Sequence, residues 1–320
     1  MYRISVIITI YNQPFESIVQ TLNSLVHQDF KSFEVVVADD CSKVSQESAI
    51  KNYFSKAGFS DYRIVANKEN VGTVRNIIGA LMVSSGEYIK INGAGDLLYA
   101  PDTLSKIDEF CRKSQTNFAF GKIKTFSNVG DEITIQSFNA PSNPQLFIGD
   151  QSRDDILTRM LMKDDWIPGG AIFAKREYLT GYLSTLADDY HVRYCEDLVS
   201  PLVVFDGRID YLDEYVLWYE WGVGISNDGT SSAKKKMYKD HSNFFSALIQ
   251  TWINNGLPKK AYRRFKIKRF VVLGTPLGGL LGRYRTSRYL NPVKTQSGNS
   301  QNEQDFLLAN LFSADQDYIR

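Results

Sequence analysis

The hydrophobic positions of the first hundred residues fall into short runs that alternate with amphipathic stretches. The runs predict four strands, at Ile4–Ile10, Phe33–Asp39, Tyr62–Asn67 and Glu87–Asn92. The first two are almost continuously apolar, which is typical of strands covered on both faces. Helical periodicity separates the runs, first after Pro14. Repeated strand–helix–strand units predict a parallel sheet with right-handed crossovers, and such sheets bind ligands at the carboxyl ends of their strands.

From about Pro101 the pattern becomes mixed. The sequence predicts helices at Asp102–Ser114, at Asp154–Met162 and in the stretch that ends at Pro201, and strands around Phe118–Thr125 and Glu132–Phe138. Trp166–Leu179 indicates a loop and a strand, and after Gly229 the chain becomes helical and basic. The predicted fold class is therefore α/β. It has a mostly parallel central sheet flanked by helices, with a helical, basic C-terminal appendage.

Composition supports a folded enzyme-sized domain. The 320 residues are 43% hydrophobic and 13% aromatic, enough for a sizeable core. The three cysteines form no closely spaced pair, which argues against a disulfide framework or a structural zinc site and fits a reducing compartment. Apolar runs are too short for a membrane-spanning helix or a signal peptide.

The formal net charge is only +1, but its distribution is uneven. Lys259–Lys294 holds eleven basic and no acidic residues, interleaved with apolar ones. This pattern favours a segment that binds a membrane surface, where cations attract anionic headgroups. A plain solvated helix and a nucleic-acid-binding segment are the alternatives.

Several common chemistries have no support in the motifs. The first glycine is Gly58, so the first strand is followed by neither the glycine-rich dinucleotide fingerprint nor a P-loop. The chain has no G-x-S-x-G elbow, and His27, His191 and His241 show no metal-ligand spacing. The sheet must bind its ligand by other groups.

Polar side chains at the strand ends are the first candidates. Asp39 and Asp40 end the second strand, where a carboxylate can accept from a uracil N–H or a ribose hydroxyl. Capping of the next helix is an equal alternative. Arg75 lies near the start of a predicted helix, where backbone N–H groups and a guanidinium suit a diphosphate. The alternative for Arg75 is a surface ion pair.

An ordered set of motifs carries a family resemblance. The segments SVIITIYN, SLVHQDFKSFE, VADDCS, NVGTVRN and GEYI occur in this order within about the first 105 residues. Together they resemble the nucleotide-binding half of family 2 glycosyltransferases with the A-type fold, such as those that make bacterial capsules, O-antigens and exopolysaccharides. The match extends more loosely to about Ser226. It implies inverting transfer of a sugar from a nucleoside diphosphate to an acceptor hydroxyl.

The resemblance divides the chain and assigns the donor site. It implies a nucleotide-sugar-binding half at 1–105, an acceptor-binding half of the same domain at 106–228, and the helical, basic region at 229–320. Thr9 and Tyr11 would line the base pocket. Asp40, with Asp39 beside it, would accept from the base or ribose, and Arg75 would contact the diphosphate.

The segment NGAGDLL stands where the family carries a D-x-D cluster for Mg²⁺ or Mn²⁺. Counted from GEYI, Asp96 falls on the last acid of the cluster, and Gly93 and Gly95 replace the earlier ones. Counted back from PDTL, the register slips by one residue. A single carboxylate is workable when phosphate and water complete the cation's shell. Gly95 would let the backbone approach the sugar phosphate. The alternative is a tight turn without a metal.

The segment YCEDLVSP resembles the family's acidic pair at a helix start. By position Asp197 would be the general base, which transfer to a sugar hydroxyl requires. Glu196 is the rival or helper. The alternative is an acid that only favours the first turn of a helix.

Two further segments resemble the acceptor side. Trp166 and Gly169, in WIPGG, would lie near an acceptor sugar, although a core tryptophan beside a turn is equally consistent. Tyr219–Ser226 would form a lid over the donor, with Trp221 near the acceptor. Family members often carry a histidine or arginine near this loop, where this chain has Glu220, Trp221 and Gly222.

Together these features predict a glycosyltransferase at the cytoplasmic face of the plasma membrane. It would use a UDP-sugar with Mg²⁺ or Mn²⁺ to extend a saccharide carried on a polyprenyl diphosphate, for a cell-surface polysaccharide. No nucleic-acid partner is expected. The alternative is a non-catalytic subunit of the same fold that binds a nucleotide-sugar or carbohydrate.

Overall fold

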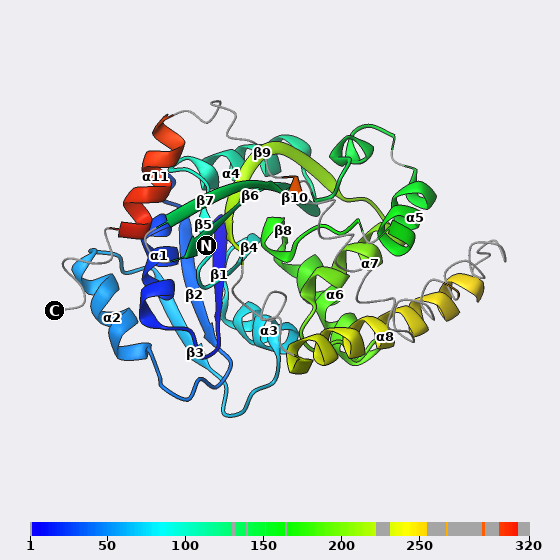
Figure 1. The fold of residues 1–320 in the computed structure, drawn as a ribbon, viewed down its shortest axis with the longest axis horizontal. Coiled ribbons are helices and arrows are strands. Elements are labelled where there is room, and N and C mark those ends of the chain that lie inside the picture. Colours follow the sequence, from blue (N-terminus) through cyan, green and yellow to red (C-terminus); the bar gives the residue numbers. More distant parts are fainter. Residues whose placement is uncertain are drawn as a thin grey trace.

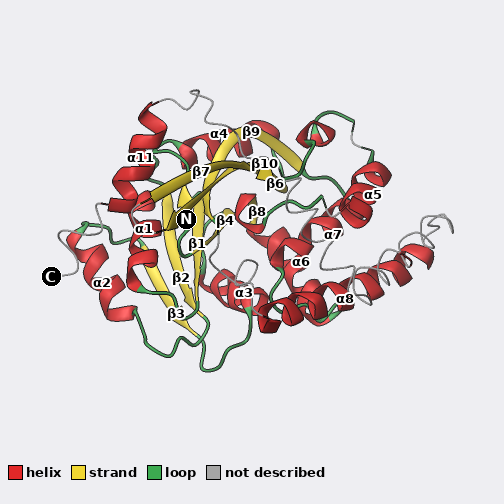
Figure 2. Ribbon diagram, viewed as in Figure 1, coloured by secondary structure: helices red, strands yellow, loops and turns green. Residues whose placement is uncertain are grey.

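Figure 1 shows the fold of the chain, a computed structural model. The structure describes residues 2–129, 132–138, 140–150, 152–163, 165–221, 231–254, 267, 290–291 and 301–312. Within them one ten-stranded sheet runs in the order β10-β7-β6-β8-β4-β1-β2-β3, and β9 pairs with both β6 and β5. Figure 2 shows these strands as one curved sheet with helices packed around it.

The first half is a parallel α/β unit. Its elements are β1 (Ile4–Ile10), α1 (Phe15–Val26), β2 (Phe33–Asp39), α2 (Glu47–Lys56), β3 (Tyr62–Ala66), α3 (Thr73–Val83) and β4 (Tyr88–Gly93). The four strands are parallel and adjacent in the order β4-β1-β2-β3. Because Thr9 is in register with both Ala38 and Gly93, the carboxyl ends of β1, β2 and β4 meet at one edge.

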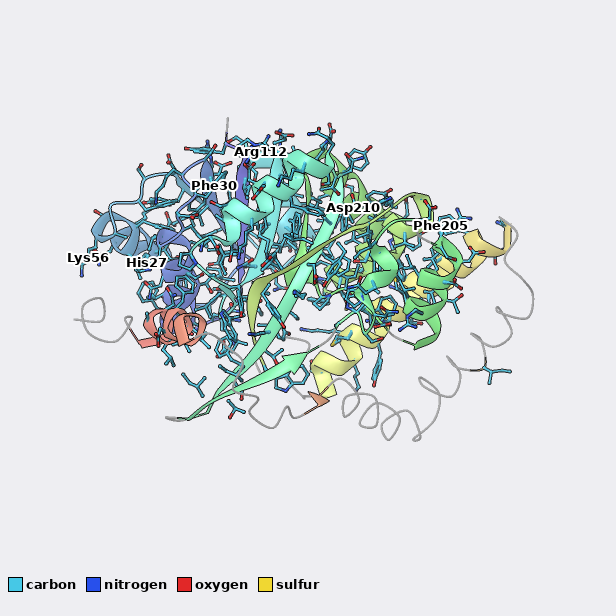
Figure 3. All side chains as sticks on the ribbon, turned by 90° about the horizontal axis from the view of Figure 1, so that it is seen from above. His27, Phe30, Lys56, Arg112, Phe205 and Asp210 are labelled. Carbon is cyan, nitrogen blue, oxygen red and sulfur yellow. The ribbon has the colours of Figure 1, made fainter. Side chains whose placement is uncertain are left out.

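The second half extends the same sheet with mixed pairing. It contains β5 (Leu97–Leu98), α4 (Thr103–Ser114), β6 (Phe118–Val129), β7 (Glu132–Phe138), η1 (Pro144–Phe147), α5 (Arg153–Lys163), η2 (Gly169–Ala171), β8 (Ile172–Lys175), α6 (Arg176–Asp188), η3 (Glu196–Leu198), α7 (Val199–Asp206) and β9 (Asp210–Glu220). Strand β8 is antiparallel to β4 and β6, whereas the long strands β6 and β9 are parallel (Figure 3). The mixed second half is confirmed.

The described parts of the C-terminal region pack on this body. They are α8 (Ser231–Asn254), β10 (Leu290–Asn291) and α11 (Gln301–Phe312). Phe244, Phe245 and Leu248 of α8 belong to the main hydrophobic core. Leu307 and Leu311 of α11 join a smaller core, and α11 lies beside α1 (Figure 1). These helices therefore share cores with residues 1–228. The three-part division of the chain stays a prediction.

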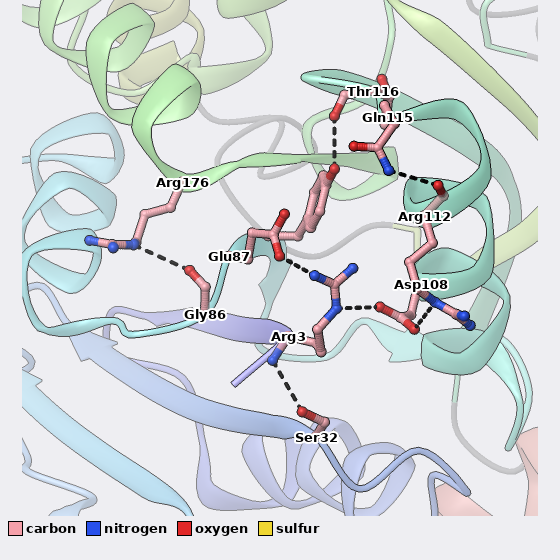
Figure 4. A network of polar contacts seen from close by, with 10 residues as sticks. Arg3, Ser32, Gly86, Glu87, Asp108, Arg112, Gln115, Thr116 and Arg176 are labelled. Atoms are coloured by element: carbon pink, nitrogen blue, oxygen red, sulfur yellow. Dashed lines mark hydrogen bonds and ion pairs between the residues drawn. The ribbon is translucent and has the colours of Figure 1, made fainter. Parts of the chain in front are cut away.

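At the amino ends of β1 and β4, a polar network joins the sheet to α4 (Figure 4). Arg3 Nε donates to Asp108 at 2.9 Å, and Arg3 also pairs with Glu87. Arg112 donates to the second oxygen of Asp108 at 2.8 Å. The ion pairs therefore fix the end of the sheet away from the carboxyl edge.

The four strands predicted in the first half are confirmed, with ends shifted by at most one residue. The predicted helix end at Pro201 is wrong, because α7 continues to Asp206 with Pro201 in its first turn. A proline there gives up no helical hydrogen bond, since N–H groups of the first turn have no partner inside the helix. Helix α6 was not predicted because it follows β8 directly, without turn residues.

The basic segment Lys259–Lys294 lies outside the described residues, apart from Ile267 and the two residues of β10. Its membrane-surface, solvated-helix and nucleic-acid interpretations therefore stay predictions. None of the described helices is both long and apolar enough to cross a membrane.

Candidate active site

The carboxyl edge of the sheet gathers the predicted base-pocket residues. Thr9 Oγ1 donates to the Asn92 carbonyl at 3.5 Å, and the Thr9 carbonyl accepts from Ala94 N at 3.1 Å. The end of β1 is thus fixed to the NGAGD turn. Tyr11, two residues on, is 44% exposed. The contacts of Thr9 and Tyr11 with a base stay predictions.

The two acids at the end of β2, Asp39 and Asp40, bond to loops and not to the next helix. Asp39 accepts from Ser42 N at 2.8 Å. The buried carboxylate of Asp40 accepts backbone N–H groups of Val71 at 2.7 Å and Gly72 at 2.9 Å. Helix α2 starts only at Glu47 and has no side-chain cap. The capping alternative is therefore wrong. Asp40 instead fixes the loop that leads into α3, and its contact with a base or ribose stays a prediction.

Arg75 lies in the first turn of α3, as predicted. Its guanidinium pairs with Asp188 at the end of α6 at 2.6 Å, and both side chains are more than half exposed. The ion pair of the alternative interpretation is present. It leaves the guanidinium accessible to solvent, so a diphosphate contact also stays a prediction.

Strand pairing brings an acid to Asp96 that the sequence analysis did not assign to the site. Leu97 of β5 is in register with Trp218 of β9, which places the end of β9 beside the NGAGD turn. The backbone N–H of Glu220 donates to Asp96 Oδ1 at 3.1 Å. Among the described residues, the buried Oε2 of Glu220 has no hydrogen-bond partner. Two carboxyl groups therefore share this corner.

Glycines make room for the acids. Gly95 has φ +103°, and a Cβ on it would stand 2.3 Å from Glu220 Oε2. A Cβ on Gly169 in η2 would stand 2.2 Å from Glu196 Oε1. The carboxyl groups thus lie directly on glycine backbone, which explains why the segments NGAGD and PGG carry glycine at these positions.

Burial gives the acids pKa values near neutrality. It raises the pKa of Asp96 to about 7 and that of Glu220 to about 7. It raises the pKa of Glu196 to about 8, with further repulsion from Asp197 and Asp96. Burial also raises the pKa of Asp197, to about 6, against hydrogen bonds from backbone N–H groups. The two adjacent acids titrate as a coupled pair, and the member that is ionised can act as a general base.

A buried lysine, also missed, anchors the glycine turn of η2. Lys90 Nζ donates to Asn92 Oδ1 at 2.7 Å, to the Ile91 carbonyl at 2.9 Å and to the Gly170 carbonyl. Burial lowers the pKa of Lys90 to about 7. The sequence feature that could have identified Lys90 is a lysine inside the apolar run EYIKIN. Because each of its three N–H donors has an acceptor, Lys90 positions η2 against the end of β4.

The two predicted acceptor tryptophans differ in their surroundings. The partly buried Trp166 packs against His241 and Phe245 of α8, with ring centroids 5.9 and 5.7 Å away. This packing is expected from the alternative interpretation, a core tryptophan beside a turn. Trp221 N donates to the Phe126 carbonyl at 2.7 Å. The rest of the predicted lid, residues 222–226, lies outside the described part of the chain. Acceptor contacts stay predictions for both residues.

The structure therefore brings Asp96, Gly95, Gly169, Glu196 and Asp197 together. Asp96 and Asp197 both act on the pKa of Glu196 by charge, and Glu196 lies on Gly169. Asp40 is linked to this group through Val71 and Gly72, whose loop contacts Arg193 shortly before the acidic pair. Asp39 instead bonds to Ser42, and Arg75 pairs with Asp188. Within the described residues, no three His, Cys, Asp or Glu side chains group so as to hold a metal ion by themselves.

Comparison with solved structures identifies the architecture. A crystal structure of residues 1–349 of Staphylococcus aureus TarS matches 98% of this chain and 80% of that one, with a TM-score of 0.51 and 19% sequence identity. The structure titled as its complex with UDP-GlcNAc matches 98% and 81%, with a TM-score of 0.50 and 18% identity. The chain thus has the glycosyltransferase A-type fold that the motifs predicted.

Sequence comparison then identifies the family. The model of "Glycosyl transferase family 2" matches residues 5–169, a little over half of the chain. The chain therefore belongs to glycosyl transferase family 2, a family of glycosyltransferase enzymes. Poly(ribitol-phosphate) beta-N-acetylglucosaminyltransferase TarS, from S. aureus strains Mu50 and MW2, is 30% identical over 143 residues. That match covers 44% of this chain and 24% of each relative.

Proposed function

We propose that this protein transfers a sugar, with inversion, from a nucleoside-diphosphate sugar to a hydroxyl of a saccharide acceptor. The observation that carries the proposal is the position of Asp197. It combines a pKa near 6 with a place beside Glu196, which faces Asp96 at the carboxyl edge of the sheet. A base there can act on an acceptor held over the donor.

In the proposed reaction Asp197 takes the proton of the acceptor hydroxyl while the hydroxyl oxygen attacks the anomeric carbon of the donor sugar. The new glycosidic C–O bond forms as the C–O bond to the diphosphate breaks, and the nucleoside diphosphate leaves with that electron pair. We propose that Glu196 carries the proton of the pair, since burial and the charges of Asp197 and Asp96 favour its neutral form. It adds no second negative charge beside the base.

The donor is proposed to be a UDP-sugar. Thr9, Tyr11, Asp39 and Asp40 would surround the base and ribose, and Arg75 would reach the diphosphate. The matched S. aureus protein is named as an N-acetylglucosaminyltransferase, and one of its structures is titled as a complex with UDP-GlcNAc. UDP-GlcNAc is therefore the first donor to test.

The resemblance implies Mg²⁺ or Mn²⁺, and the corner of Asp96 and Glu220 fits such a cation. Both side chains offer carboxylate oxygen, and Glu220 Oε2 is buried without a hydrogen-bond partner among the described residues. These cations accept one or two carboxylates and complete their shell from phosphate and water. When bound, the cation would neutralise charge on the departing diphosphate.

The acceptor and the cellular location are proposed on the basis of the sequence. The acceptor would be a saccharide on a polyprenyl diphosphate at the inner face of the plasma membrane, bound by the half at 106–228. Trp166, Gly169 and Trp221 would lie on this side. The basic region at 229–320 would supply the attraction to anionic lipid.

Release of nucleoside diphosphate over a panel of donors and lipid-linked acceptors tests the proposal. We expect turnover with a UDP-sugar, lost in Asp197→Asn while calorimetry still detects donor binding. Donor binding with no turnover in the wild type would instead support the non-catalytic binding subunit. No turnover and no nucleotide binding would overturn both. Loss of metal-dependent transfer in Asp96→Ala, with weaker Mn²⁺ binding by titration, would support the cation site.

A further inference from the structure

Helix α8 sends one buried carboxylate toward the acidic pair. Asp240 is the only acid in Ser231–Asn254, and it is 3% exposed. Its Oδ2 accepts three consecutive backbone N–H groups, from Arg193 at 3.1 Å, Tyr194 at 2.5 Å and Cys195 at 3.1 Å. The last of these residues directly precedes Glu196.

Three successive amides aimed at one anion form a backbone nest, an arrangement that suits negative charge. The three N–H groups belong to a loop, so the regular helix and strand bonds do not satisfy them. Without Asp240 they would lose their common acceptor at the point where the chain enters η3. The carboxylate therefore fixes the backbone that presents Glu196 and Asp197.

The same loop is held on its other side by the donor half. The Arg193 carbonyl accepts from Val74 N at 3.0 Å, and Arg193 Nε donates to the Val71 carbonyl at 3.2 Å. A Cβ on Gly72 would stand 2.3 Å from Arg193 Cγ, so the two loops are in close contact. Asp40 fixes this donor-half loop through Val71 and Gly72. Residues 193–195 thus link α8 to the donor loop.

We propose that Asp240 is a positioning residue for the candidate base: it clamps the backbone of Arg193–Cys195 and so sets Asp197 relative to the donor half. This inference rests on the proposed function for its catalytic consequence. It also gives α8 a direct role in the active site, beyond that of an appendage.

The negative charge of Asp240 also bears on the pair, because it raises the pKa of both Asp197 and Glu196. Asp96, from the β4–β5 turn, also raises the pKa of Glu196. Burial and the charges of Asp197, Asp240 and Glu196 raise the pKa of the neighbouring Cys195 thiol. Two cations, Lys236 of α8 and Arg193, lie over the Tyr194 ring, 5.1 and 5.3 Å from its centroid. Removal of the Asp240 charge should therefore lower the pKa of the base and shift the acid limb of the pH profile of kcat to lower pH.

Two variants separate the parts of the clamp. Asp240→Asn keeps an acceptor oxygen but removes the charge, and Asp240→Ala removes both. A control variant is Asn243→Ala, on the next turn of α8, which removes a 3.2 Å hydrogen bond to the His191 carbonyl of the same loop. We expect kcat to fall about tenfold in Asp240→Asn and about a hundredfold in Asp240→Ala, since small misplacements of a catalytic group have effects of this size. Donor KM should change less than about threefold, and Asn243→Ala should stay within about twofold of the wild type.

Two readouts distinguish positioning from general stability. The acid limb of the kcat profile should move to lower pH in Asp240→Asn, and hydrogen exchange of the 193–197 amides should accelerate in both Asp240 variants. Unchanged kcat, pH profile and exchange in Asp240→Asn would overturn the inference. A different outcome would separate the two proposals. If exchange accelerates in the Asp240 variants but the wild-type protein binds donor without turnover, the clamp is supported and the proposed function is refuted. Equal losses in Asp240→Asn and Asn243→Ala would reduce Asp240 to an ordinary packing residue.

Discussion

Replacement of the candidate base should make the protein more stable while it abolishes transfer. Burial raises the folded-state pKa of Asp197 to about 6 from 3.8. Ionisation of this carboxyl is therefore harder in the folded state than in the unfolded chain, and its charge opposes folding at neutral pH. Asp197→Asn keeps the size of the side chain and removes that charge.

The magnitude follows from the size of the pKa difference. A rise of about 2 pH units corresponds to about 3 kcal/mol. Solvent reaches part of the side chain, and this screening brings the expected gain to about 1–2 kcal/mol. The stability of the wild type falls as the pH rises from the unfolded to the folded pKa, so the advantage of Asp197→Asn should be complete above about pH 6. It should shrink to about half near pH 5.

Denaturant unfolding at pH 5 and pH 8, with transfer assays on the same samples, measures both effects. General-base catalysis predicts a loss of about 10²–10⁴-fold in kcat. Asp213→Asn is the control, because a hydrogen bond from Tyr211 and the nearby Lys122 lower the pKa of that exposed carboxyl. It should change stability by less than about 1 kcal/mol, in the opposite direction. An Asp197→Asn protein that is less stable at pH 8, or that transfers normally, would refute the reasoning.

Three further substitutions test the contacts around the site. Gly95→Ala should cost about 1–3 kcal/mol of stability by denaturant unfolding, because φ is +103° and the new Cβ meets Glu220; wild-type stability would contradict the turn geometry. Arg75→Ala should raise donor KM with less than about 1 kcal/mol lost in stability, whereas Asp188→Asn breaks the same exposed pair and should leave KM unchanged. Equal KM in the two variants would exclude the diphosphate contact. Trp166→Ala should lower the free energy of unfolding by about 2–4 kcal/mol through lost packing on α8, and Trp166→Phe should restore it. If Trp166→Phe also restores the KM for the acceptor, no sugar stacking specific to tryptophan is needed.

Much of the donor half could be predicted from local pattern. A buried parallel strand is encoded by a short apolar run, and a crossover helix by its periodicity, so β1 to β4 required no knowledge of distant contacts. The order of the strands then brings their carboxyl ends to one edge, with Thr9, Asp40 and Asp96 placed there by position alone. The wrong predictions concern helices whose ends carry no local signal. These are α6, which was not predicted, and α7, which continues past Pro201.

Pairings over long sequence distances decided the rest. Glu220 reaches Asp96 only because β9 pairs with β5, and Asp240 reaches Cys195 only because α8 folds back on the body. No motif surrounds Asp240, and the predicted lid around Glu220 gives that acid no role. The raised pKa of Glu220 and the three hydrogen bonds of Asp240 arise from burial and contacts with distant segments, which no local pattern contains. The sequence by itself thus determined the four parallel strands of the donor half and indicated the family, and it singled out the candidate base. Only the tertiary structure decided which carboxyl groups surround that base and what holds it in place, because those contacts join residues far apart in the chain.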